Sequence, residues 1–422
     1  MKEKNNNQNK KSIWGLIIVA SLGYFVDIYD LVLFNVVKKE SLESIGLSGA
    51  MLEQYDVSLF NWQMTGMLIG GLLWGILGDK RGRIQVLFGS ILLYSIANIA
   101  NAFVDNTTTY ALWRLVAGIG LAGELGAGIT LVVESMEKEK RGYGTMIIVT
   151  FGALGGVAAR IVGGKGADLA QTLGWNLEGW RMAYIVGGVL GIILLMLRAG
   201  AFESGMFKQM KESSVSKGNF LSLFKTKERV LKYLACIAIG LPVWFVVGVL
   251  INQSHKIAPY IGVIGEVKVG DSVMWSYVGL SVGDLLSGVL SQWLKSRRKV
   301  VFIYLGFLSV TVGIYLFNHQ ISINTFHLMC MLLGASTGFW ALFVTIASEQ
   351  FGTNLRSTVA NTVPNFVRGA TVLITMGFVS LLPYGAGIAC SIVGAICIGL
   401  SFIATWYVKE TFHKELDYFE TS

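Results

Sequence analysis

Ionisable side chains interrupt the long apolar stretches of this sequence at a few positions: Asp27, Asp30, Arg114, Glu124, Arg160 and Arg368. A charged group inside a hydrocarbon layer costs about 3 kcal/mol or more unless a counter-ion, a cavity or water compensates it. Such positions therefore indicate internal ion pairs, proton transfer or the binding of a charged solute.

Asp27 and Asp30 are three residues apart and share a helix face with Tyr24. Burial raises the pKa of a carboxyl group and a nearby cation lowers it, so such a group can gain and lose a proton as its surroundings change. We interpret Asp27 and Asp30 as proton-coupling groups, with a structural ion pair as the alternative. Glu124 is a candidate second proton carrier or substrate ligand, with packing or pairing as the alternative.

Arg368 lies near the middle of its apolar stretch, on a polar stripe with Asn361 and Asn365. Pro364 is expected to bend the same helix. A guanidinium facing a cavity can bind a carboxylate or phosphate through a two-pronged fork. Arg368, its two asparagines and Arg160 are therefore candidate contacts of an anionic substrate. The alternative for Arg368 is an internal ion pair with one of the three buried carboxylates.

Aromatic side chains are the further candidates for the wall of a substrate cavity. Tyr24, Trp244 and Trp340 all fall within apolar stretches. Aromatic residues in such stretches also face lipid or pack against other helices, so lipid contact or packing is the alternative reading.

Membrane-spanning helices must position these side chains. The chain has 422 residues, of which 53% are hydrophobic and 14% charged, as in an integral membrane protein. Twelve segments are long enough to cross a hydrocarbon core of about 30 Å. They cover residues 13–37, 57–77, 84–104, 109–132, 143–165, 181–199, 230–251, 273–294, 299–318, 325–347, 357–380 and 384–408. The sequence predicts an all-α membrane protein with twelve transmembrane helices.

Lys and Arg concentrate in alternate loops, which predicts a multi-pass protein of the cell (inner) membrane with both termini in the cytoplasm. The net charge of +8 follows from this asymmetry and does not indicate nucleic-acid binding. Residues 200–229 form a long basic segment, typical of a linker on the inner lipid leaflet. We therefore divide the chain into bundles at 1–199 and 230–422, joined by a linker at 200–229.

Several chemistries are excluded by spacing. Gly118–Gly123 fits a dinucleotide-binding pattern, but it lies within an apolar span and not between a strand and a helix. No phosphate-binding loop sequence occurs. The four cysteines form no Cys-x-x-Cys pair and have no histidines at ligand spacing. We expect no enzymatic activity, no cofactor and no metal site.

The turn between the second and third spans reads Gly-Ile-Leu-Gly-Asp-Lys-Arg-Gly-Arg over Gly75–Arg83. It resembles the loop between helices 2 and 3 of the major facilitator superfamily. The gating residues that this resemblance implies are Gly75, Gly78, Asp79, Arg81, Gly82 and Arg83. A weaker copy in the second half includes Asp284. Two acid–base pairs repeat the same seven-residue offset after spans four and ten: Glu134 with Arg141, and Glu349 with Arg356.

Other segments resemble metabolite:proton symporters of that superfamily, among them Asp27–Asp30, Ala122–Gly128 and Ser348–Arg356. The resemblance implies two pseudo-symmetric six-helix bundles, with spans one and four adjacent. Arg114 would then be a partner for Asp27 or Asp30.

The function implied is proton-coupled symport of a small organic anion by alternating access. The expected partners are that solute, protons and the lipid bilayer, with the protein as a monomer. The alternatives are a sugar, polyol or phosphate porter, or a membrane receptor that binds without transport.

Overall fold

The computed structural model describes residues 2–81, 83–126, 128–129, 141–203 and 220–412. In the first half the helices are α1 (Lys2–Ser44), α2 (Gly49–Arg81), α3 (Arg83–Asn101), α4 (Thr107–Leu121), α6 (Arg141–Thr172) and α7 (Gly179–Glu203). These correspond to the first six predicted spans, although residues 127 and 130–132 of the fourth lie outside the description. Helices therefore occupy the apolar segments, as the lack of hydrogen-bonding water in a bilayer requires.

The second half repeats this arrangement with more irregular helices. Its elements are η2 (Phe220–Phe224), α8 (Lys227–Phe245), the π-helix η3 (Val246–Ile251), α9 (Ser254–Ile261), α10 (Val269–Leu294), α11 (Arg297–Phe317), α12 (Ile323–Ser336), α13 (Trp340–Glu349), α14 (Thr353–Leu381), η4 (Leu382–Tyr384) and α15 (Ala386–Tyr407). The seventh predicted span is thus α8 running on into η3, and the tenth is divided between α12 and α13.

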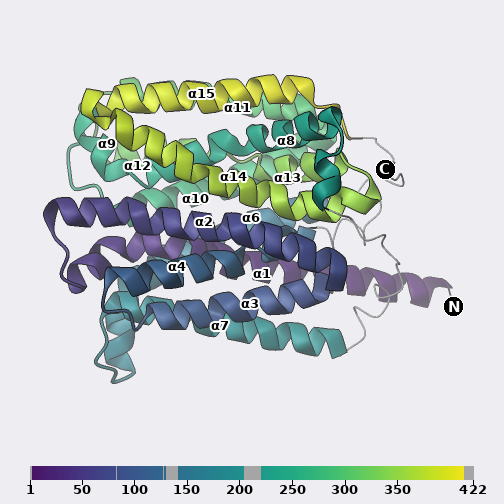
Figure 1. The fold of residues 1–422 in the computed structure, drawn as a ribbon, viewed down its shortest axis with the longest axis horizontal. Helices are drawn as coiled ribbons and strands as arrows, with labels where there is room; N and C mark the ends of the chain where they lie inside the picture. Colours follow the sequence, from purple (N-terminus) through teal and green to yellow (C-terminus); the bar gives the residue numbers. More distant parts are fainter. Residues whose placement is uncertain (1, 82, 127, 130–140, 204–219, 413–422) are drawn as a thin grey trace.

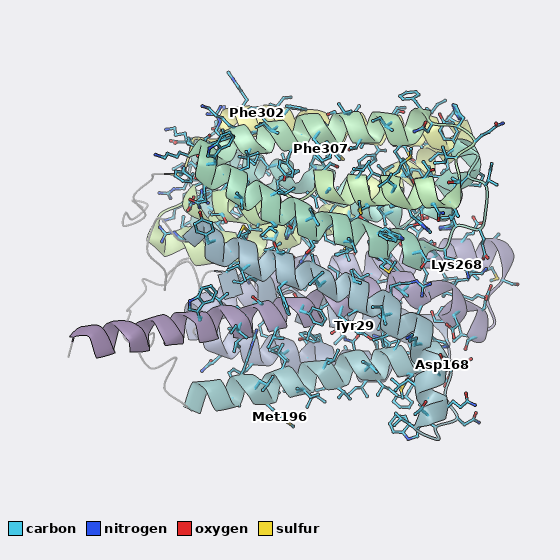
Figure 2. The ribbon with its side chains drawn as sticks, turned by 180° about the vertical axis from the view of Figure 1, so that it is seen from behind. Tyr29, Asp168, Met196, Lys268, Phe302 and Phe307 are labelled. Atoms are coloured by element: carbon cyan, nitrogen blue, oxygen red, sulfur yellow. The ribbon has the colours of Figure 1, made fainter. Side chains whose placement is uncertain are left out.

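Nine stretches within the described residues are long and apolar enough to cross a membrane. Large apolar side chains cover the outside: Met196 is 67% exposed, whereas Tyr29 is fully buried. Figure 2 shows Met196 at the outer edge and Tyr29 among the helices. An apolar outer face and a polar-containing interior are what a membrane-embedded bundle requires.

Two groups of helices face each other across the middle of the molecule (Figure 1). α2 packs against α14 and α6 packs against α10, with smaller contacts of α1 with α10 and of α6 with α13. α1 begins and α15 ends at the same end of the molecule. The space between the halves is bounded by α1 and α6 on one side and by α8, η3, α10, α13 and α14 on the other.

Two span boundaries differ from the sequence prediction in a way that affects function. We predicted that the first span ends at residue 37 and the second begins at residue 57, which leaves Lys38 and Asp56 outside both spans. In the structure α1 continues to Ser44 and α2 begins at Gly49, so both charges lie within helices and are buried. Their mutual compensation reduces the cost of burying either charge alone.

Candidate functional site

A small cavity lies between the two halves, with a volume of about 20 Å³. Its walls come from seven helical segments and consist of Tyr24, Ile28, Ala153, Val243, Trp244, Val247, Tyr277, Leu280, Trp340 and Arg368. Four of these, Tyr24, Trp244, Trp340 and Arg368, were proposed from sequence as substrate contacts. A cavity of this size holds about one water molecule, so the structure represents a closed conformation that must expand to admit a solute.

Arg368 provides the positive charge of this cavity. Its side chain is 1% exposed, and its guanidinium carbon lies 5.9 Å from the centre of the Trp244 ring and 5.8 Å from that of Trp340. Nη1 donates a long hydrogen bond of 3.5 Å to Asn365, while Nε has no partner. No Asp or Glu among the described residues forms a salt bridge with it within 4.0 Å. Arg368 is thus a buried cation between two indole rings with no described carboxylate within salt-bridge distance, and Asp27 of α1 acts on it at longer range.

The two asparagines of the same helix close the cavity on one side and do not line it. Asn365 donates to the carbonyl of Ala122 at 2.7 Å. With the oxygen and nitrogen of its side-chain amide exchanged, Asn361 accepts a hydrogen bond from the backbone N–H of Gly75 at 3.0 Å and donates one to the same Ala122 carbonyl at 3.2 Å. These contacts join α14 to α2 and to the chain after α4. They assign Asn361 and Asn365 to the contact between the halves, with Asn365 also touching Arg368.

A buried ion pair closes the opposite end. Nζ of Lys38 on α1 lies 2.7 Å from Oδ1 of Asp56 on α2. The same ammonium donates to the carbonyl and side-chain oxygens of Asn252, in the second half, at 3.0 Å each. His255 of α9 approaches the second Asp56 oxygen at 3.7 Å. One lysine therefore satisfies acceptors from both halves, which holds this end shut.

Arg160 also lies at that end, and not in the cavity. Its Nε donates to Oδ1 of Asp271, the third residue of α10, at 2.6 Å, and both side chains are about one-quarter exposed. The structure thus separates Arg160 from Arg368, although the sequence suggested the same role for both. Because α6 and α10 belong to different halves, this pair is a second contact that must break when the end opens.

The carboxylates of the first half differ in their partners. Glu124 accepts hydrogen bonds from both terminal nitrogens of Arg198, one of them at 2.9 Å, and both side chains are buried. Asp27 and Asp30 are equally buried, yet one oxygen of Asp27 and both oxygens of Asp30 have no hydrogen-bond partner. A buried carboxylate without partners strongly favours its protonated form. Glu124 thus has a cationic partner in Arg198, whereas Asp27 and Asp30 each have buried oxygens without a hydrogen bond.

Arg114, which we proposed as a partner for Asp27 or Asp30, bonds elsewhere. It donates to the side chain of Gln63, and more weakly to the hydroxyl of Tyr184 at 3.4 Å. Its guanidinium also lies 4.8 Å from the centre of the Phe34 ring. No salt bridge joins it to a described carboxylate within 4.0 Å, but its charge acts on Asp30 of α1 at longer range.

The gating residues are only partly within the described region. Gly75 packs against Asn361 and Thr362. Gly82 and Glu134 lie outside the described residues, and the side chains of Gly78, Asp79, Arg81, Arg83 and Arg141 are likewise not described. Glu349 bonds Arg297 at 2.8 Å and is buried with Arg356. Asp284 lies well inside α10 and not at the loop that follows it.

Sequence reasoning overlooked three contributors. Tyr277 lines the cavity, but a lone tyrosine in an apolar span gives no signal of its own. Arg198 was assigned to a span edge, although an arginine at the end of an apolar run could have been paired with Glu124. Lys38 and Asp56 fell between the first two predicted spans and were not singled out.

Comparison with known proteins agrees with this architecture. The model of the Major Facilitator Superfamily matches residues 20–363. The chain belongs to the Major Facilitator Superfamily. It is an all-α, multi-pass membrane transporter, not an enzyme, and its twelve helices form two six-helix bundles. Its fold matches that of the proton:xylose symporter XylE with a TM-score of 0.69 over 97% of this chain and 98% of that one, at 16% identity.

Curated relatives of this transporter have similar lengths. A metabolite transport protein of Haemophilus influenzae is 25% identical over 96% of this chain and 98% of the relative. The niacin transporter NiaP of Acinetobacter baylyi is 24% identical over 81% of each chain. The benzoate transport protein of the same organism is 21% identical over 82% of this chain and 78% of the relative.

Proposed function

We propose that this transporter carries a small organic anion, a carboxylate, in symport with protons. The observation that carries the proposal is Arg368, which is buried between two indole rings with no described carboxylate as its partner. An uncompensated guanidinium at this depth costs several kcal/mol, an order-of-magnitude figure. A bound carboxylate would supply the missing charge through a fork-like pair of hydrogen bonds.

The walls around Arg368 favour a solute with a flat apolar part. Tyr24, Trp244, Tyr277 and Trp340 line the cavity, and aromatic rings stack on planar groups. The indoles of Trp244 and Trp340 also have unpartnered N–H groups in this closed conformation, which could donate to a polar substituent. The names of two relatives, a benzoate transport protein and a niacin transporter, support an acid built on a ring.

Asp27 and Asp30 supply the proposed coupling. They lie on α1, which also contributes Tyr24 and Ile28 to the cavity wall. Their unpartnered oxygens favour the protonated form while the cavity is closed, and water entering from either side would allow the proton to leave. The proposed proton-binding groups are therefore on the same helix that lines the solute cavity, so movement of α1 can link proton transfer to solute binding.

Alternating access would proceed by rocking residues 1–199 against residues 230–422. The contacts of Lys38 with Asn252 and of Arg160 with Asp271 would break on one side, and those of Asn361 and Asn365 on the other. With both termini in the cytoplasm, as proposed from the charge distribution, the Lys38 end faces outward.

Uptake into proteoliposomes tests the proposal. Radiolabelled benzoate and nicotinate are the probes, with nicotinamide and xylose as neutral counterparts and an imposed inward proton gradient. We expect at least one acid to accumulate, and accumulation to collapse when a protonophore dissipates the gradient. Accumulation of xylose or nicotinamide but of neither acid would reject the organic-anion assignment. Accumulation that ignores the protonophore would reject the coupling.

A further inference from the structure

The tenth transmembrane span is interrupted where it meets α10. We predicted a continuous helix over 325–347, but α12 ends at Ser336 and α13 begins at Trp340. A Cβ atom on Gly338 would overlap the carbonyl carbon of Gly283 on α10, so the two backbones touch at this point. The helix is therefore broken in the membrane interior, beside the cavity.

A broken helix leaves N–H groups at the start of its second part without partners in that helix. Phe339, the residue before α13, supplies no side-chain cap. Instead, Oδ1 of Asp284 on α10 accepts the N–H of Ala341 at 3.1 Å. A carboxylate at this position is stabilised by the positive end of the helix dipole. Asp284 thus caps α13 from a different helix.

Asp284 has little else to balance a negative charge. It is fully buried, its Oδ2 has no hydrogen-bond partner, and no described Lys, Arg or His lies within 4.0 Å. The titratable side chains that face it are Tyr24 from α1 and Tyr304 from α11. Of the other ionisable groups on packed helices, Arg160 of α6 bonds Asp271 and His327 of α12 stacks on Trp275, both toward the start of α10.

The cap is directly connected to the cavity wall. Trp340 is the first residue of α13, and its ring lies 6.3 Å from that of Trp244 and 4.9 Å from that of Phe343. The Arg368 guanidinium faces the same Trp340 ring. A shift in the first turn of α13 therefore moves one of the two indoles that enclose Arg368, in a cavity that must expand to bind a solute.

We propose that Asp284 is a proton-binding group of the second half, and that its ionised form holds Trp340 in the cavity wall. When a proton from the cavity water bonds to Oδ2, the charge that attracts the α13 N-terminus disappears. The new O–H also needs an acceptor of its own. The first turn of α13 is then released and Trp340 can move. The link between Trp340 and substrate binding rests on the proposed function. The protonation of Asp284 is independent of that function.

Infrared difference spectroscopy of the reconstituted protein, between alkaline and acidic pH, tests the proton site without any substrate. We expect a protonated-carboxyl band that Asp284→Asn removes. Glu266→Gln is the matched control, since Glu266 is an exposed carboxylate of the loop before α10, and it should leave that band unchanged. Identical bands in the wild type and Asp284→Asn would overturn the proposal. If Asp284→Asn fails to assemble, Asp284→Glu is measured in its place and should shift the protonated-carboxyl band. A band that does not shift in Asp284→Glu would overturn the proposal as well.

Counterflow kinetics with benzoate and nicotinate test the link to Trp340. Asp284→Asn keeps the shape and one acceptor oxygen, but lacks the charge that makes such a hydrogen bond roughly twice as strong. We expect KM for a transported probe to rise about threefold or more, with Vmax little changed and the pH dependence of KM flattened. A purely structural cap would change KM by the same factor at every pH and leave its pH dependence as in the wild type, which would refute the link. If the wild type transports neither acid, the proposed function fails, while the infrared result still decides the proton site.

Discussion

Replacing Lys38 by Met should open the end of the transporter that we propose to face outward. The ammonium bonds Asp56 at 2.7 Å and two oxygens of Asn252 at 3.0 Å, and its side chain is 6% exposed. Met has a similar length and no charge, so the change removes the bonds and preserves the packing. Asp56 would then remain buried in the closed state without its cation.

The size of the effect follows from that burial. Removing one partner of a buried ion pair costs about 3–5 kcal/mol. We take about 3 kcal/mol, because His255 remains near Asp56 and water is close at this end. Because separation of the halves would expose Asp56 to water, we assign the cost of its uncompensated charge to the closed state. It corresponds to roughly a hundredfold shift toward the outward-open state.

Thiol accessibility measures this shift. Ala153 lines the cavity, and all four native cysteines are buried. In an Ala153→Cys background, a membrane-impermeant maleimide applied from outside should react much faster when Lys38→Met is present. Lys39→Met is the matched control, because Lys39 is the exposed neighbour. Unchanged labelling with Lys38→Met, or an equal increase with Lys39→Met, would refute the assignment of this ion pair as the closing contact.

Three further predictions concern pH, coupling and packing. Burial and the charge of Lys38 lower the pKa of His255 to about 4 in the closed state. The closed state is therefore favoured at pH values above the usual histidine pKa of about 6.5 and loses stability as the pH falls below it. Maleimide labelling should rise in acid, and His255→Gln should abolish that rise. Asp27→Asn should abolish accumulation driven by a proton gradient while counterflow continues, which parallel assays in the same proteoliposomes measure. Gly338→Ala should destabilise the protein by about 2 kcal/mol through overpacking, lowering its melting temperature, whereas Gly313→Ala, on a helix position with open space around it, should not.

The membrane-spanning architecture could be predicted from the sequence because a bilayer accepts so few solutions. Each long apolar segment must satisfy its own backbone hydrogen bonds, and a helix does so. The same reasoning did not predict that α1 and α2 continue past Lys38 and Asp56 and bury both charges. Two opposite charges from different helices compensate each other, and no local pattern shows that they will meet.

The candidate site was predicted in part for a related reason. Arg368, Trp244 and Trp340 were identified because their types are unusual or costly within apolar spans. That they would converge, while Arg160 paired with Asp271 elsewhere, depends on how the two halves are arranged. Hydropathy alone does not specify that arrangement.

The interruption at Gly338 could not be predicted, because it depends on close contact with a second glycine on a distant helix. The composition of residues 325–347 is that of an unbroken span, and the break becomes visible only once α10 is packed against it. The role of Asp284 was not predicted either, because its carboxylate can cap α13 only if the tenth span is interrupted and a helix begins there.

Binding of a transported acid to Arg368 variants tests the central claim most directly. Isothermal titration with whichever of benzoate or nicotinate the wild type transports gives the affinity without the proton gradient. Loss of a buried counter-charge should cost about 2–5 kcal/mol, so Arg368→Ala should weaken binding by roughly thirtyfold or more. Arg368→Lys should recover only part of it, because lysine lacks the planar fork. A folded Arg368→Ala protein that binds the acid with wild-type affinity would contradict the account.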